Sequence, residues 1–171
     1  VPVTRRRVSG RLSAMQAPVV AAAGNSGPKQ NTISTPGVSP MIITVGAVDD
    51  KRTTDYKDDV IADFSSRGPV NGKLIKPDLV APGVRITAAN ADKDYTGASR
   101  AEALKTPYTS MSGTSVATPV VSGAAALLLS KNSKMTPPEV KEAIMKNTVG
   151  MSVSKYAQGS GILNIRKSLD I

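Results

Sequence analysis

The stretch that most constrains the fold is a long apolar run, Val116–Leu129, which contains no charged residue. A helix that is apolar on nearly every side is usually central and covered by its neighbours. We therefore expect a buried helix here, covered all round. The run is too short, and too interrupted by Thr118, Pro119, Ser122 and Gly123, to span a bilayer.

Three hydroxyl residues, Ser112, Thr114 and Ser115, stand at the start of this predicted helix. Spacing alone favours a capping role, in which Ser115 or Thr114 caps the helix and Pro119 is tolerated in the first turn. A hydroxyl at this place also lies beside unpaired backbone N–H groups and the positive end of the helix dipole. An oxyanion formed when the hydroxyl attacks a carbonyl would be stabilised there. Capping and nucleophilic chemistry are compatible.

The remaining pattern predicts an α/β layer architecture. Two continuous apolar runs, Val19–Ala23 and Met41–Asp49, indicate buried strands of a parallel sheet covered by helices. Short strands are expected on either side of Ala81–Gly83. An amphipathic surface helix is expected over Thr136–Asn147, where a T-x-x-E capping box ends on Glu139. A polar exposed loop is expected over residues 90–106, and a turn and short helix near the end of the chain.

Composition limits the classes of function. The 171 residues suggest one domain with a sizeable core. No Cys and no His are present, which removes thiolate chemistry and the commonest general base. The net charge of +9 is spread along the chain, with Arg5–Arg7 as the one cluster and no aromatic platform for bases. We expect neither a nucleic-acid nor a membrane partner, although a basic nucleic-acid binder stays an alternative without a motif.

Five segments, in order, resemble subtilisin-like serine proteases (subtilases). SGTSVATPVVSGAAALL resembles their catalytic-serine segment and places Ser115 on the nucleophile. VVAAAGNSGP resembles the segment of the oxyanion-hole asparagine and places it on Asn25. STPGVSPMIITVGAVD, FSSRGP…KPDLVAPGV and the closing GSGILN complete the resemblance from about residue 17 onward. FSSRGP and SVATP resemble bacterial AprX-like subtilases most.

The resemblance implies a subtilisin-like three-layer αβα fold with a mainly parallel sheet, of which this chain is the C-terminal portion. It implies a serine endopeptidase that cleaves peptide or protein substrates through an acyl-enzyme on Ser115. The Asn25 amide and the Ser115 N–H would bind the oxyanion. The residues expected to contact substrate are Ala22, Ala23, Gly24, Gly113 and Thr114.

The resemblance stops short of the two other residues that subtilase catalysis needs. Neither the D-[ST]-G segment of the aspartate nor the H-G-T-H segment of the histidine is present. In one interpretation residues 1–171 are part of a catalytic domain, inactive alone, whose N-terminal part supplies Asp and His. In the other, the chain is a non-catalytic subtilase-like binding module. Residues 1–10 do not resemble a signal peptide, and localisation stays open.

The sequence predicts no cofactor and no metal site. The aspartates at 49, 50, 55, 58 and 59 do not match an EF-hand and alternate with Lys and Arg, which favours a solvated loop. Calcium is expected, if at all, in the full-length protein and largely through segments outside this chain. By resemblance, backbone carbonyls near residues 37–42 could form a weak cation site.

Overall fold

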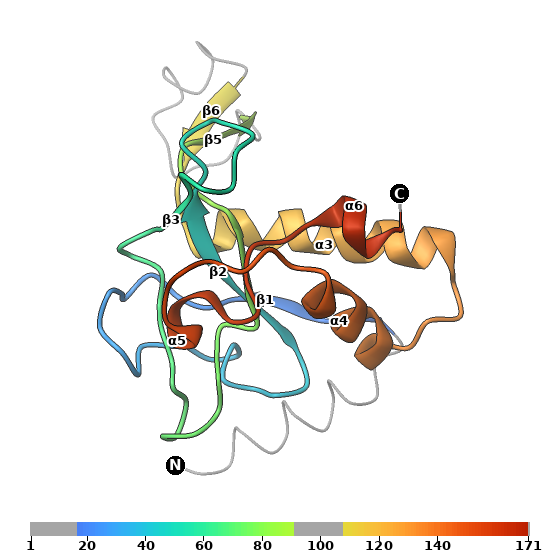
Figure 1. Cartoon of the computed structure of the whole chain (residues 1–171), viewed down its shortest axis with the longest axis horizontal. Helices are drawn as coiled ribbons and strands as arrows, with labels where there is room; N and C mark the ends of the chain where they lie inside the picture. Colours follow the sequence, from blue (N-terminus) through green and yellow to red (C-terminus); the bar gives the residue numbers. More distant parts are fainter. Residues whose placement is uncertain (1–16, 91–107, 171) are drawn as a thin grey trace.

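The computed structural model describes residues 17–90 and 108–170, and its centre is a small, mainly parallel sheet (Figure 1). Strands β1 (Val20–Ala22), β2 (Ile43–Asp49) and β4 (Leu79–Pro82) run parallel. The short β3 (Val60–Ile61) is antiparallel to β2. The predicted strands over residues 19–23 and 41–49 are thus present, as is the α/β architecture.

Strand β2 is the middle of the sheet. Val45 pairs with Ala22 of β1 on one edge and with Leu79 of β4 on the other. Val48 also pairs with β4 on one side and with Ile61 of β3 on the other. It follows that β1 and β3 lie one after the other along the same edge of β2, with β4 along the opposite edge.

Alternating side chains of β2 reach the two faces of the sheet. Val45 and Ala47 join the main core beneath helix α3 (Thr114–Lys131), while Val48 packs with Val80 and Ile162 on the opposite face. Both faces are covered, so six of the seven residues of β2 are buried. This agrees with the continuous apolar run that predicted the strand.

Helix α3 differs from the prediction in one respect. Ala117, Val121, Ala124 and Leu128 are buried against the sheet and α4, but the expectation that the helix is covered all round is wrong. A second row of small or apolar residues faces solvent: Pro119, Ser122, Gly123, Ala126 and Leu127. The apolar run shows that every side of the helix tolerates burial, and the described elements cover only one side of it.

The C-terminal third supplies three further helices: α4 (Pro137–Lys146), α5 (Lys155–Gln158) and α6 (Ile165–Ser168). The predicted capping box is present, since the N–H and hydroxyl of Thr136 both donate to Glu139 Oε2 at 2.7 Å. Val140 and Ile144 are fully buried against α3. The start of α4 is therefore fixed by a local hydrogen-bond pair, and its position by the core.

A two-stranded ribbon projects from the body next to the start of α3 (Figure 1). It consists of β5 (Ile86–Ala89) and β6 (Tyr108–Met111), paired antiparallel. The predicted polar loop over 90–106 and the Arg5–Arg7 cluster lie outside the described residues, apart from residue 90. Within the described ranges, no helix is both long and apolar enough to cross a membrane.

Candidate active site

The fold brings Asn25 and Ser115 together, 90 positions apart in the sequence. Asn25 lies in the turn that follows β1, and Ser115 lies in the first turn of α3, which packs across β1 and β2. The point where a Cβ on Gly113 would sit is 3.2 Å from Ser115 Oγ, 3.4 Å from Asn25 Nδ2 and 3.8 Å from Ser115 N. A hydroxyl, an amide NH₂ and a helix N–H therefore border one small space beside Gly113.

Thr114 fixes which way the Asn25 amide points. Its backbone N–H and its hydroxyl both donate to Asn25 Oδ1 at 2.9 Å. Because two donors converge on that atom, it must be the carbonyl oxygen, and the NH₂ group is directed away from Thr114. The Thr114 hydroxyl also accepts the Gly24 N–H at 3.2 Å. The amide that borders the space beside Ser115 is thus a donor.

The capping interpretation of the hydroxyl residues is wrong. The N-cap of α3 is Gly113, and no side chain caps the helix. The hydroxyl of Thr114 donates to Asn25 Oδ1, and Ser112 Oγ accepts the N–H of Arg85 at 2.9 Å. Ser115 is exposed, and no described residue accepts its N–H, whereas the N–H of Val116 donates to Gly113 O. Within residues 17–90 and 108–170, neither the hydroxyl nor the N–H of Ser115 has a hydrogen-bond partner, and both lie at the positive end of an 18-residue helix.

The predicted substrate-contact residues on β1 and its turn lie beside this space but differ in what they can offer. Ala23 is fully buried, its N–H donates to Val45 O, and its carbonyl accepts the Ser34 N–H. Alternation along a parallel strand directs the N–H and C=O of the half-buried Ala22 to the outer edge of β1. Contact of Ala22, Ala23, Gly24, Gly113 and Thr114 with a substrate stays a prediction.

Two lysine ammonium groups donate hydrogen bonds to backbone carbonyls within residues 37–42. Lys141 Nζ donates to Pro40 O at 3.0 Å and to Ile42 O at 2.7 Å, and it pairs with Asp78. Lys76, which is fully buried, donates to Ile42 O and lies 2.6 Å from Asp78 Oδ2. Two of the carbonyls considered for a weak cation, those of Pro40 and Ile42, are therefore bonded to side-chain cations of the protein itself.

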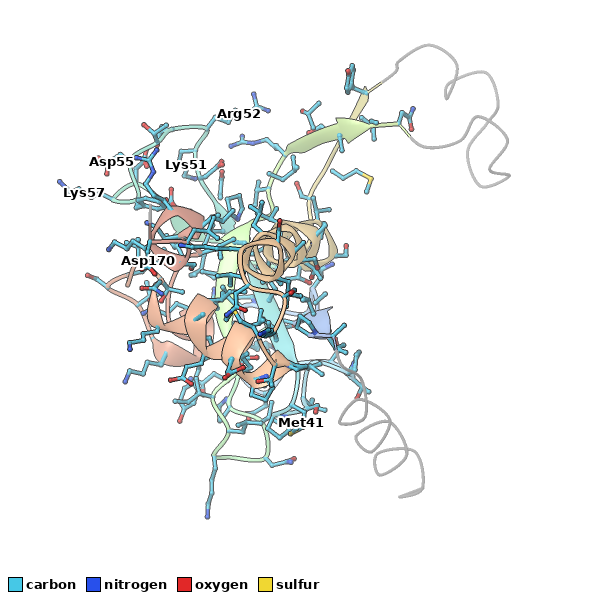
Figure 2. The ribbon with its side chains drawn as sticks, turned by 90° about the vertical axis from the view of Figure 1, so that its right-hand side faces the viewer. Met41, Lys51, Arg52, Asp55, Lys57 and Asp170 are labelled. Carbon is cyan, nitrogen blue, oxygen red and sulfur yellow. The ribbon has the colours of Figure 1, made fainter. Side chains whose placement is uncertain are left out.

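The acidic loop over residues 49–59 projects from the body, and Arg52, Asp55 and Lys57 are exposed on it (Figure 2). The Lys51 ammonium pairs with Asp49 at 3.1 Å. Burial, together with neighbouring carboxylates, raises the pKa of Asp59.

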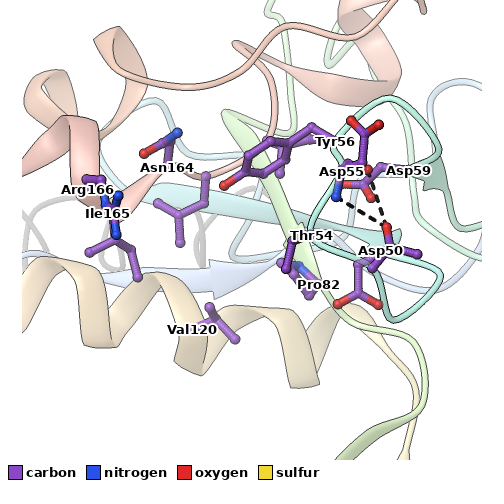
Figure 3. A pocket seen from close by; sticks show the side chains of 13 residues that line it. Asp50, Thr54, Asp55, Tyr56, Asp59, Pro82, Val120, Asn164, Ile165 and Arg166 are labelled. Atoms are coloured by element: carbon purple, nitrogen blue, oxygen red, sulfur yellow. Dashed lines mark hydrogen bonds between the residues drawn. The ribbon is translucent and has the colours of Figure 1, made fainter.

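A pocket lies between this loop and α6. Tyr56 lines it, and acidic side chains line one side of it (Figure 3). Residues 17–90 and 108–170 contain no group of three or more potential metal-ligating His, Cys, Asp or Glu side chains. Neither Ser115 nor Asn25 lines this pocket.

The subtilase family model matches residues 5–161 of the chain. The chain belongs to the subtilase family. It is 47% identical over 131 residues to the serine protease AprX of Bacillus subtilis, which covers 76% of this chain and 30% of AprX. It is 35% identical over 149 residues to subtilisin DY of Bacillus licheniformis, which covers 86% of this chain and 44% of that subtilase.

Solved structures agree with the subtilase assignment. Sphericase superimposes with a TM-score of 0.71 at 27% identity over 92% of this chain, and the prenylagaramide maturation protease PagA with a TM-score of 0.66 at 29% identity over 90%. The chain spans about half of each of these structures and 30% of AprX. The comparison confirms the predicted family and the predicted subtilisin-like α/β fold.

Two buried serines are not indicated individually by the sequence, and one of them bonds to the turn that carries Asn25. Ser65 and Ser66 are both fully buried in the segment that follows β3. Ser66 bonds to the turn of Asn25, and Ser65 bonds to Ala47 of β2. These partners are 40 and 18 residues away in the sequence. No local pattern of apolar and polar residues could have indicated these contacts.

Proposed function

We propose that this chain supplies the nucleophile and the oxyanion site of a serine endopeptidase. Ser115 Oγ attacks the carbonyl carbon of the scissile peptide bond and forms an acyl-enzyme, which water then hydrolyses. The observation that carries the proposal is the convergence of Ser115 Oγ, Ser115 N–H and Asn25 Nδ2 on the space beside Gly113. Membership of the subtilase family supports it independently.

The two donors act on the charge that develops during the attack. As the carbonyl becomes tetrahedral, its oxygen gains negative charge, which the Asn25 NH₂ and the Ser115 N–H stabilise more than they stabilise the neutral carbonyl. The helix dipole at the start of α3 acts in the same direction. Because Thr114 already orients the Asn25 amide, little reorganisation accompanies the reaction.

The proton of Ser115 needs an acceptor that this chain does not provide in a recognisable motif. The sequence contains no His, and none of its lysines or carboxylates stands in a D-[ST]-G or H-G-T-H segment. We therefore propose that a segment bearing the family's Asp and His joins this chain, and that the chain alone is inactive. A substrate peptide would lie along the outer edge of β1, beside Ala22. Calcium, if the full-length protein takes it up, would be held largely by that other segment.

A hybrid protease tests the proposal. This chain replaces the matching segment of B. subtilis AprX, and hydrolysis of a chromogenic peptide is measured beside the chain alone. We expect activity in the hybrid, none in the chain alone, and loss of both turnover and fluorophosphonate labelling in the Ser115→Ala hybrid. Asn25→Ala should lower kcat by about 10²–10³. A folded hybrid that binds the peptide without cleaving it would instead favour the non-catalytic binding module.

A further inference from the structure

We propose that Ser66 is a positioning residue for Asn25, because it holds the two peptide units on either side of it. This inference rests on the proposed function, since it concerns how the oxyanion donor is aimed. Among the described residues, Ser66 forms no hydrogen bond with Ser115, and none of its atoms is among those nearest to the space beside Gly113. It acts only through the backbone of the turn that carries Asn25.

Ser66 brackets Asn25 with two hydrogen bonds. Its backbone N–H donates to the carbonyl of Gly24 at 2.9 Å, in the peptide unit that precedes Asn25. Its hydroxyl oxygen accepts the N–H of Ser26 at 3.1 Å, in the peptide unit that follows Asn25. Ser66 is fully buried, whereas Asn25 and Ser26 are exposed. The exposed turn is thus bonded to one buried residue on both sides of Asn25, to its backbone N–H on one side and to its hydroxyl on the other.

Packing leaves the turn no room to shift towards Ser66. Gly24 has a φ of +110°, and a Cβ at that position would lie 2.8 Å from Ser66 Oγ and 2.7 Å from Ser34 Oγ. The backbone therefore lies directly against these two hydroxyl groups, with glycine as the residue that fits. Rotation of either peptide unit beside Asn25 would swing its amide across the site.

The two supports of Asn25 act at different ends of its side chain. Thr114 holds the amide head by its carbonyl oxygen. Ser66 holds the backbone from which the side chain starts. A donor aimed at a transition state must be placed to within about 0.5 Å, and a misplacement of about 1 Å can lower turnover by about 10²-fold. Both ends must be held to reach that accuracy.

Ser65 provides a matched control. It precedes Ser66, is equally buried, and likewise accepts one backbone N–H, that of Ala47 at 3.0 Å. Ala47 lies inside β2 and not in the turn of Asn25. Replacing either serine by alanine removes one hydroxyl and leaves one backbone N–H without its acceptor, that of the buried Ala47 or that of the exposed Ser26. Ser65→Ala should therefore cost at least as much stability as Ser66→Ala, because water can reach the Ser26 N–H but not the Ala47 N–H. The two variants differ in whether the lost bond supports Asn25.

The experiment compares Ser66→Ala with Ser65→Ala in the hybrid protease. We expect Ser65→Ala to lower the thermal midpoint at least as much as Ser66→Ala. Ser66→Ala should lower kcat by about tenfold with KM nearly unchanged, because a misaimed donor weakens transition-state binding alone. Ser65→Ala should leave kcat within about twofold of the parent, since its bond does not reach the turn. Equal effects of the two variants on kcat would overturn the inference.

A double-mutant cycle separates positioning from general destabilisation. In the Asn25→Ala background there is no amide to aim, so adding Ser66→Ala should leave kcat unchanged. An unchanged tenfold loss in that background would show that Ser66 does not act through Asn25. If Asn25→Ala itself leaves kcat unaltered, it is the proposed oxyanion role that fails. Should Ser66→Ala not fold, Ser66→Cys, a weaker acceptor of similar size, carries the same cycle with a smaller expected loss.

Discussion

Gly113 stands where a side chain would fill the site. A Cβ at this position would lie 3.2 Å from Ser115 Oγ and 3.4 Å from Asn25 Nδ2, in the space assigned to the oxyanion. We expect Gly113→Ala in the hybrid protease to lower kcat by about 10²-fold, because the methyl group displaces the reacting carbonyl from its donors. The measurement is peptide hydrolysis, with circular dichroism to confirm that the variant is folded.

Gly123 provides the control on the same helix. It is exposed, and a Cβ there would meet nothing within 4 Å. Gly123→Ala should leave kcat unchanged and raise the free energy of unfolding by about 0.5–1 kcal/mol, because alanine favours the helix. If the two substitutions affect kcat alike, then the space beside Gly113 is not where the carbonyl binds.

The residues of the site were predictable to different degrees. Asn25 and Ser115 follow from the resemblance of their segments to known subtilases, and the structure places them side by side. The chemistry of Thr114 differs from the prediction, since spacing suggests a cap and the hydroxyl instead donates to Asn25. Ser66 could not be predicted, because its importance arises from a partner 40 residues away.

The capping box of α4 is a small element whose stability depends on pH. Hydrogen bonds from the Thr136 N–H and hydroxyl lower the pKa of Glu139. A lowered carboxyl pKa contributes stability above the unfolded value, near pH 4.3, and that contribution is lost as the pH falls through the folded value. Thr136→Ala should cost about 1 kcal/mol at pH 7 in urea unfolding, and the difference should shrink at pH 3.

Ser154 is the matched control for this cap. Its hydroxyl oxygen accepts the Tyr156 N–H at 3.2 Å at the start of α5, with no carboxylate in the contact. Ser154→Ala should therefore cost a similar amount at pH 7 and the same amount at pH 3. If the cost of Thr136→Ala does not change with pH, the Glu139 carboxylate is not what makes that cap stable.

At the level of elements, the pattern of apolar residues predicted which strands and helices form, but not which of their faces are buried by neighbouring elements. The runs over 19–23 and 41–49 gave the strands β1 and β2, and the capping box gave the start of α4. The run over 116–129 gave helix α3, but its exposed row was missed. The amino-acid types along a helix or strand show which of its faces can be buried. Which elements pack against those faces is determined only by the tertiary structure.

At the level of the whole molecule, one buried charge cluster joins parts that are distant in sequence. Lys76 and Asp78 precede β4, Thr44 belongs to β2, and Lys141 belongs to α4. Asp78 accepts the Thr44 N–H at 2.7 Å and contacts both ammonium groups. Thr44 in turn donates its hydroxyl to Gly37 O at 2.7 Å, in the loop before β2. The sheet, a helix and a loop therefore share one electrostatic centre.

This cluster makes the stability of the molecule depend on pH in an unusual direction. Burial lowers the pKa of Lys76 to about 8, although Asp78 opposes the shift. An unfolded lysine titrates near 10.4. Between these values the unfolded chain binds the proton that the folded chain has lost, so the contribution of Lys76 to stability rises with pH. Below about pH 8 both states are protonated, and the contribution is constant.

Lys76→Met removes this titration and retains most of the side chain's volume. We expect the free energy of unfolding of the parent, relative to Lys76→Met, to rise as the pH increases from 8 to 10.5 and to stay level from 6 to 7. Urea unfolding of the hybrid protease at each pH measures it. If the relative stability falls over the upper range instead, then Asp78 outweighs burial, Lys76 stays charged well above pH 8, and the centre is held by an intact ion pair.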